Sequence, residues 1–319
     1  MKKFWLVPFA MLLSTPALAA EVSVIESYDA SIGELPEGVA VGPDGDIYVT
    51  LAGTGELRHL DRHTYAGETL ASFDTGFGFL LGMAFNGPDL YVALASFVES
   101  TSGVWRVYPD GSKTRVIAFG GGEFPNDLTF DQAGNMYVTE SISGSVYKIP
   151  AGTTSRELWI QDPLLVGDVT RSPVPFPIGA NGIAYDDVTG SVLVANSQTP
   201  RVVEIEDIGG YAGAVGIVAE GEHLRGADGI SIDKNGDVVV VSNYYSTIYR
   251  VDRASGVAEA LADGSDGLVF PSTVAFGQHG PDKHSLFIAN FGFGAGPSAP
   301  VGLLKLEYGE KSERVPTGR

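Results

Sequence analysis

The chain has 319 residues, a formal net charge of −19 and no cysteine. Such an excess of negative charge argues against nucleic acid or an anionic membrane as a partner. Without cysteine there can be no disulfide and no thiolate for a nucleophile or a zinc site, so a hydrophobic core must hold the chain together.

The first predicted element is a signal peptide. Residues 2–3 are lysines, residues 4–13 are apolar, and Ala17-Leu18-Ala19 has the small-x-small pattern of a cleavage site. The apolar stretch is too short to span a membrane, and no later segment of the sequence is long and apolar enough. We predict a signal peptide over 1–19, a single domain over 20–319, and export as a soluble protein to the periplasm, with secretion to the medium as the alternative.

After this segment the chain repeats one pattern six times. In each repeat a short apolar strand opens after a similar segment of two or three residues, and the openings are 44, 45, 55, 47 and 44 residues apart. A regular period of this length is typical of a closed or stacked repeat array. The residues at the six openings, called the ring positions below, are Glu37, Leu81, Asn126, Asn181, Asp228 and Ser272.

Each repeat has the pattern of four antiparallel strands. In the first, residues 38–41 precede the turn Pro43-Asp44-Gly45, whose glycine supplies the positive φ of a tight hairpin, and a second strand follows over 46–50. The second strands are β-branched and aromatic, as buried strands are. Six such units predict an all-β fold, a six-bladed β-propeller of four-stranded antiparallel blades. A β-sandwich or an open solenoid is the competing interpretation, but the polar caps of a solenoid are missing.

The two ends of the chain are predicted to close the ring. Little sequence after Leu306 is left for a regular fourth strand in the last blade, and residues 22–26 have no partner in the first. We therefore predict that this N-terminal strand completes the last blade, which removes an open edge.

In a propeller the ring positions meet at one end of the central channel. Asparagine and aspartate are poor strand formers, so their presence there needs a reason. Two carboxylates and two amides are the donors that Ca²⁺ prefers, with places left for water and substrate, whereas zinc prefers Cys and His. The predicted calcium ligands are Glu37, Asn126, Asn181 and Asp228.

Two other interpretations of the ring remain open. The amides and carboxylates could satisfy one another around a water-filled channel and hold the blades in register, since buried polar groups need partners with or without a metal. A purely structural calcium ion is the second.

Further candidates for substrate binding lie beside the ring, near the ends of the second strands and in the adjoining loops. The apolar loops 163–177 and 291–297 are expected to emerge on the same face as the ring, together with Phe97 and Tyr245. The residues assigned to substrate binding are Asp127, Leu81, Ser272, Glu140, Asn196, Asn243, Tyr244, Asn290 and Phe291.

The strand-opening motifs resemble those of the regucalcin/gluconolactonase family of six-bladed propellers, which is more distantly similar to the paraoxonases. The resemblance covers the whole mature chain in repeat plan, but its specific part is confined to four tripeptides in the proper order. These are Pro36-Glu37-Gly38, Pro125-Asn126-Asp127, Ala180-Asn181-Gly182 and Ala227-Asp228-Gly229.

This resemblance implies a divalent-metal-dependent hydrolase of small-molecule lactones or related esters, with Ca²⁺ as the expected ion and another divalent cation as the alternative. We expect a monomer or a weak homo-oligomer. The metal would polarise the carbonyl and activate water, and Asp228 would be the general base or would orient that water. The chain departs from the family at two points. Leu81 stands where the paraoxonase branch has a catalytic histidine, and residues 120–124 lack the arginine with which gluconolactonases grip a sugar acid. Sugar lactones are therefore not favoured over more apolar ones.

Two other functions stay open. A propeller with a structural polar or calcium axis could bind a ligand or a protein without catalysis, because fold alone does not decide function. A condensing enzyme similar to strictosidine synthase should work without a cation. A lyase would need histidines at the axis, and the ring positions have none.

Overall fold

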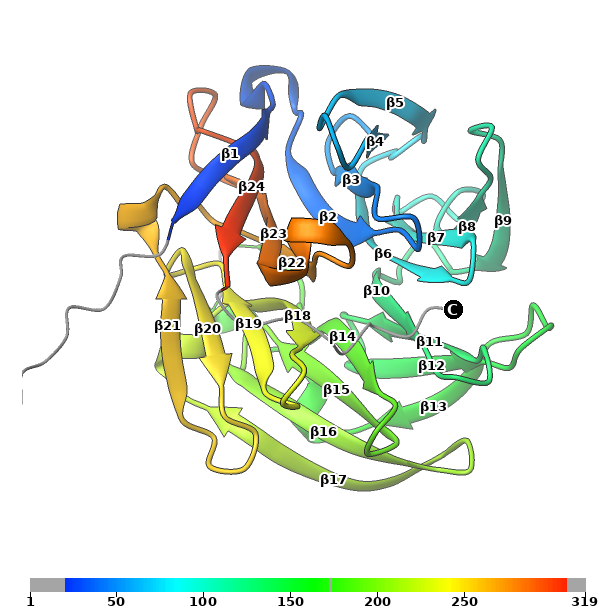
Figure 1. Ribbon diagram of the computed structural model, residues 1–319. Coiled ribbons are helices and arrows are strands. Elements are labelled where there is room, and N and C mark those ends of the chain that lie inside the picture. The colour runs from blue at the N-terminus through cyan, green and yellow to red at the C-terminus, as the bar shows by residue number, and fades with distance from the viewer. Residues whose placement is uncertain (1–20, 172–173, 309–319) are drawn as a thin grey trace, which may run out of the picture.

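The fold is a closed ring of six antiparallel sheets (Figure 1). The computed structural model describes residues 21–171 and 174–308, and the predicted signal peptide lies outside them. Each sheet in the described part of the chain has four strands. The six-bladed β-propeller predicted from the repeats is confirmed.

Blades one to five each use four consecutive strands, in order from the ring outward. Blade one contains β2 (Pro36–Val41), β3 (Ile47–Leu51), β4 (Glu56–Leu60) and β5 (Gly67–Ser72). Blade two contains β6 (Phe79–Asn86), β7 (Asp89–Ala95), β8 (Gly103–Val107) and β9 (Lys113–Ala118). Blade three contains β10 (Pro125–Phe130), β11 (Met136–Glu140), β12 (Ser145–Ile149) and β13 (Glu157–Gln161). Blade four contains β14 (Ala180–Asp186), β15 (Ser191–Asn196), β16 (Arg201–Ile208) and β17 (Tyr211–Glu220). Blade five contains β18 (Ala227–Ile232), β19 (Val238–Ser242), β20 (Thr247–Val251) and β21 (Ala258–Ala262).

Blade six joins the two ends of the chain. It consists of β22 (Thr273–Phe276), β23 (Ser285–Asn290), β24 (Gly302–Glu307) and, outermost, β1 (Val22–Ser27). Strand β1 pairs antiparallel with β24, with Val22 opposite Leu306. Glu26 of β1 also forms an ion pair with Arg58 of blade one, 2.7 Å apart. The predicted ring closure by the N-terminal strand is confirmed.

The helical segments are short 3-10 turns. They are η1 (Ala30–Ile32), η2 (Pro163–Leu165), η3 (Val169–Arg171), η4 (Glu222–Leu224), η5 (Gly264–Asp266) and η6 (Gly280–His284). Over residues 21–171 and 174–308, we find no helix with the length and apolar character that crossing a bilayer would require.

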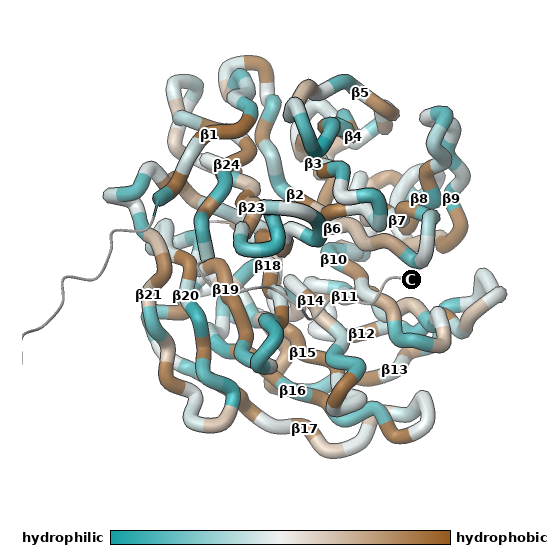
Figure 2. The backbone as a smooth tube through the Cα atoms, in the orientation of Figure 1, coloured by the Kyte–Doolittle hydropathy of each residue, from teal (hydrophilic) through white to brown (hydrophobic). Residues whose placement is uncertain are grey.

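The hydrophobic core lies between the blades. Six apolar clusters are each built from two consecutive blades, so every blade packs on both neighbours around the ring. Figure 2 shows hydrophobic segments along the strands and hydrophilic ones at many of the turns. Burial of this apolar surface is the main stabilising contribution in a chain without disulfides.

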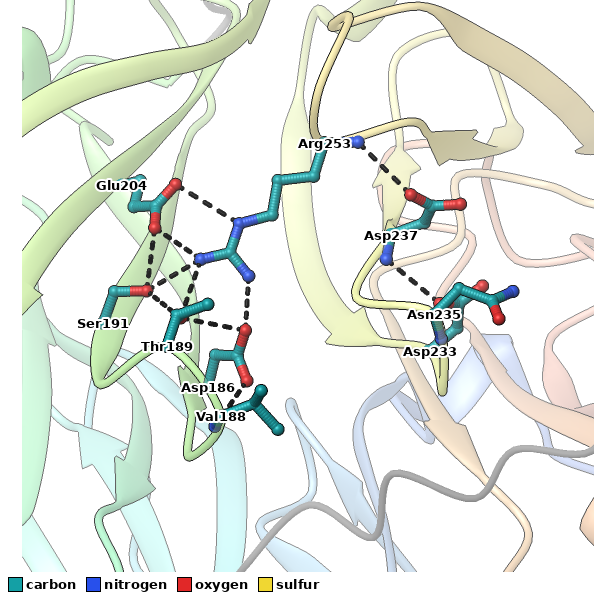
Figure 3. A network of polar contacts seen from close by, with 9 residues as sticks. All are labelled: Asp186, Val188, Thr189, Ser191, Glu204, Asp233, Asn235, Asp237 and Arg253. Carbon is teal, nitrogen blue, oxygen red and sulfur yellow. Dashed lines mark hydrogen bonds and ion pairs between the residues drawn. The ribbon is translucent and has the colours of Figure 1, made fainter.

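An ion-pair network joins blades four and five (Figure 3). Arg253, after β20, forms ion pairs with Asp186 of β14 and Glu204 of β16, and its guanidinium donates to Ser191 at 2.8 Å. The side chains of Arg253 and Asp186 are only 14% and 2% exposed. Buried charges of this kind need their partners, so the network fixes the contact between these two blades.

The first strands of blades one to five share a β-bulge at the ring. In blade one, Pro36 pairs with Leu51 and Val39 pairs with Val49, so that Glu37 and Gly38 face a single residue of β3. The same irregularity occurs in β6, β10, β14 and β18. A bulge re-aims the side chain at its first position, and here that position is the ring position.

Candidate functional site

The four predicted ligands occupy equivalent bulge positions on four blades and are buried. Glu37, Asn126, Asn181 and Asp228 are exposed by only 4–6%. Antiparallel pairing places the beginning of each first strand beside the end of the second strand, as in Ala180 opposite Asn196. We call this end of the ring the strand-opening face. The connections that lead from one blade to the next lie on the same face.

Two serines hold the asparagine amides in one orientation. Asn126 Nδ2 donates to Ser141 Oγ at 3.0 Å, and Asn181 Nδ2 donates to Ser197 Oγ at 2.7 Å. Each serine hydroxyl donates in turn to the next blade, to the carbonyl oxygens of Ala180 and Ala227. Because the hydroxyl protons are used there, each serine can only accept from the amide, which fixes its NH₂ end. The oxygen of each amide is the end that the serine does not use.

The two carboxylates are held differently. Asp228 Oδ2 accepts a hydrogen bond from Asn243 Nδ2 at 3.0 Å, and the Asn181 amide also hydrogen-bonds the Asp228 carboxylate. Glu37 Oε2 is buried and has no hydrogen-bond partner among the described residues. A buried carboxylate oxygen without a donor is costly and points to a missing positively charged partner.

Burial and neighbouring charge raise the pKa values of three acidic groups near the axis. Burial raises the pKa of Asp228 to about 7, with a further upward contribution from the charge of Asp127, against hydrogen bonds from Asn243 and Asn181. Burial also raises the pKa of Asp127 to about 7. Burial and then the charges of Asp228 and Asp127 hold the pKa of Glu37 well above its ordinary value. A bound cation would remove this repulsion.

The donor set fits a hard cation only if the amides take part. Within residues 21–171 and 174–308, no three His, Cys, Asp or Glu side chains lie close enough together to hold an ion by themselves. The site instead offers two carboxylates and two oriented amide oxygens. Oxygen donors of this mixed kind suit Ca²⁺ and are unsuited to zinc.

Asp127 follows the ring position of blade three and lies at the end of the central channel next to the ring. Its Oδ1 accepts from its neighbour Leu128 N at 2.8 Å, and its Oδ2 accepts from Ile183 N of blade four at 3.2 Å. It lines a channel of about 390 Å³ whose walls come from all six first strands. The four predicted ligands are not among the channel's lining residues. Asp127, predicted to bind substrate, thus lies between the ring and the channel and ties blade three to blade four.

The other two ring positions carry no free ligand. Leu81 is buried in the apolar cluster between blades two and three. Ser272 is fully buried, and its hydroxyl donates to the carbonyl oxygen of Glu37 at 2.6 Å across the seam between blades six and one. Leu81 therefore makes one side of the ring apolar, while Ser272 positions the strand that carries Glu37.

Three residues predicted to bind substrate have their polar atoms engaged elsewhere. Both carboxylate oxygens of Glu140 accept hydrogen bonds from its own loop, including Ile142 N and Ser143 N. Asn196 holds the insertion through Leu164 O and Val166 O, and Asn290 bonds Val269 N and Pro300 O. All three are buried. They shape the loops, and we do not carry them forward as substrate contacts.

The pairing of the second strands shows which of their end residues are equivalent. Strand β11 ends at Glu140 and β15 ends at Asn196, whereas β19 ends at Ser242. Asn243, predicted together with Glu140 and Asn196, therefore lies one residue later than they do, in register with Ser141 and Ser197. Those two serines are functional residues that sequence reasoning missed. Their signal was a serine directly after a polar residue at the end of two consecutive second strands.

The remaining predicted residues lie on the strand-opening face. Tyr244 is 50% exposed, and the guanidinium of Arg225 stacks on its ring at 4.0 Å. Phe291 is 8% exposed and stacks on Phe293, with ring centroids 5.3 Å apart. The insertion contributes Phe176, which packs on Phe97, as expected for a loop emerging beside the ring.

Comparisons with solved structures show the same fold. A luciferin-regenerating enzyme matches with a TM-score of 0.69 and 15% identity, over 90% of this chain and 95% of that chain. A gluconolactonase from Xanthomonas campestris matches with a TM-score of 0.68 and 15% identity, over 90% and 89%. The calcium-binding protein regucalcin from Agrobacterium tumefaciens matches with a TM-score of 0.66 and 15% identity, over 88% and 92%.

Comparisons of sequence give no such match. No protein-family model matches the chain, and no curated protein matches it. At 15% identity the structural likeness establishes architecture and leaves activity open. The resemblance predicted from the strand-opening motifs is confirmed at the level of the fold: the chain is a six-bladed propeller similar to gluconolactonase and regucalcin.

Proposed function

We propose that the protein is an exported, calcium-dependent hydrolase of lactones or related small esters. The observation that carries the proposal is the construction of the axis. Two carboxylates and two amides occupy the equivalent bulge position on four blades, Ser141 and Ser197 hold the amides, and Glu37 Oε2 has no donor within the described residues. Export is proposed from the sequence of residues 1–19 alone.

Each residue has a distinct role in this proposal. Glu37, Asn126, Asn181 and Asp228 would hold the ion, which supplies Lewis-acid polarisation of the ester carbonyl when bound. Asn243 holds Asp228 Oδ2, and the Asp228 carboxylate accepts a proton from the attacking water. The water oxygen adds to the carbonyl carbon, the ester C–O bond breaks, and the proton taken up by Asp228 passes to the leaving alkoxide oxygen. A lactone thus gives a hydroxy acid, and an ester gives an acid and an alcohol.

Calcium titration calorimetry on the metal-stripped mature protein tests the site. The wild type is expected to bind one ion, and Asp228→Asn to lose most of that affinity. Glu68→Gln is the control for weak binding by the acidic surface, because Glu68 lies on the outer strand of blade one with a side chain 78% exposed. A pH-indicator assay with a panel of lactones, with calcium and with chelator, then tests activity.

The outcomes separate the alternatives. Binding that is lost in Asp228→Asn, together with calcium-dependent hydrolysis, supports the proposal. No binding by the wild type overturns the metal site. Binding without hydrolysis of any lactone or ester overturns the enzyme and leaves a calcium-binding propeller.

A further inference from the structure

Phenylalanines gather beside the candidate site. They come from blade openings and loops that all lie on the strand-opening face. We call this set the aromatic band: Phe79, Phe97, Phe124, Phe176, Phe270, Phe291 and Phe293.

One half of the band is continuous with the ring. The rings of Phe97, Phe124 and Phe176 contact one another with centroids 5.6–5.7 Å apart. Together with Phe79 they belong to the apolar cluster that contains Leu81. The ring position of blade two is therefore the inner edge of this aromatic surface.

The other half reaches the same place from blade six. Phe293 contacts Phe291 at 5.3 Å and Phe270 at 6.0 Å between ring centroids. It also contacts Phe79 of blade two at 6.0 Å. Since blade one lies between blades six and two, the loop that carries Phe293 extends over the opening of blade one, whose ring position is Glu37.

The backbone is strained at both halves. Non-glycine residues with positive φ are uncommon, and a bulky residue there is an outlier. Phe97 has φ +58° and Phe270 has φ +45°. Ser246, at φ +50°, accepts a hydrogen bond from Phe270 N at 3.0 Å. Such strain costs roughly 1–3 kcal/mol per residue and concentrates at functional sites.

The rings are not simply core. Phe124 and Phe291 are buried at 3% and 8% exposure, whereas the other five are partly buried and keep some ring surface open. Five partly open phenylalanines beside a polar axis form a surface suited to an apolar ligand.

The residue two positions before each ring position differs between the two sides of the ring. Glycine stands two residues before the ring position in blades four and five, at Gly179 and Gly226. In the other four blades that position is large and apolar: Leu35, Phe79, Phe124 and Phe270. In blades four and five that space is taken by Leu165 O beside Gly179 and by Asn243 Oδ1 beside Gly226, so the side of Asn181 and Asp228 carries polar groups at this position.

We propose that the substrates are lactones or esters with a long alkyl or aryl substituent. This inference rests on the proposed function. The reacting carbonyl lies at the polar side of the ring, near Asn181 and Asp228, and the apolar substituent lies along the aromatic band. Water still adds to the carbonyl carbon with cleavage of the ester C–O bond, so the band sets specificity and takes no part in the bond changes.

The test compares γ-valerolactone with γ-dodecalactone, which differ only in alkyl length. Wild-type kcat/KM is expected to be at least tenfold higher for the longer lactone, since each buried methylene is favourable. Phe293→Ala should remove most of this preference by lowering kcat/KM for γ-dodecalactone. Phe77→Ala is the control, because Phe77 lies in the loop before β6 but is 88% exposed.

A second readout works without catalysis. An apolar fluorescent probe, N-phenyl-1-naphthylamine, is bound to the metal-free protein and displaced with each lactone. Displacement by γ-dodecalactone that weakens in Phe293→Ala and persists in Phe77→Ala supports the band as the binding surface, even if no lactone is hydrolysed and the proposed function fails. Equal rates for the two lactones, an unchanged preference in Phe293→Ala, or no displacement would overturn the inference. Unfolding midpoints of both variants exclude loss of fold as the cause.

Discussion

Ser197 provides a sharp test of how the axis is built. Its hydroxyl donates to Ala227 O at 2.7 Å and accepts from Asn181 Nδ2 at 2.7 Å. Ser197→Ala removes both bonds and leaves a buried amide group and a buried carbonyl without this partner. Each such group costs about 1–3 kcal/mol, so we expect the free energy of unfolding of the metal-free protein to fall by about 2–4 kcal/mol.

Ser197→Ala should also lower the affinity for calcium, which is measured separately from stability. Without the serine, the Asn181 amide is free to rotate and its oxygen no longer points reliably to the axis. Loss of a group that orients a ligand typically lowers metal affinity 10–100-fold. Urea unfolding of the metal-free protein measures the loss of stability, and titration calorimetry with calcium measures the loss of metal affinity.

Ser231→Ala is the matched control. Ser231 is as buried as Ser197, and its hydroxyl also joins neighbouring blades, donating to Val274 O at 2.9 Å. It lines the channel and holds no ring residue. We expect this variant to lose stability, by about 1–3 kcal/mol, and to keep its calcium affinity. If Ser197→Ala also kept its affinity within twofold, the idea that the serines orient the ligands would be refuted.

Three other predictions concern the ring and the blades around it. Burial raises the pKa of Asp127 and Asp228 from 3.8 to about 7, so these groups release protons on unfolding between pH 4 and 7. The free energy of unfolding of the metal-free protein, measured with urea, should therefore fall from pH 4 to 7. A rise over this range would contradict the prediction. Gly182→Ala would place a Cβ 2.2 Å from Asp228 O, so the free energy of unfolding should fall by about 1–3 kcal/mol. Titration calorimetry should also show weaker calcium binding. Arg253→Leu removes the guanidinium that forms ion pairs with the buried Asp186 and with Glu204, and should cost about 3–5 kcal/mol in denaturant unfolding. A cost below about 1 kcal/mol would refute a stabilising network.

The repeat pattern alone determined the architecture. Strand-forming runs recur at a near-constant period, and each run needs a neighbour to bury its apolar face, so spacing and composition were enough to predict six blades. The closure by β1 followed from the same reasoning, since the last repeat lacked a strand and the first had one too many. The ring positions were also readable, because Asn and Asp at the start of an apolar strand contradict local propensity.

Only the tertiary structure decided what surrounds those positions. The prediction grouped Asn243 with Glu140 and Asn196, but strand pairing shows that Ser242 is the residue equivalent to those two, and one residue changes which side chain meets the axis. The serines that orient the amides act across blades, through contacts between residues 30–39 positions apart. The aromatic band likewise joins blades six and two, so its rings meet only when the propeller closes.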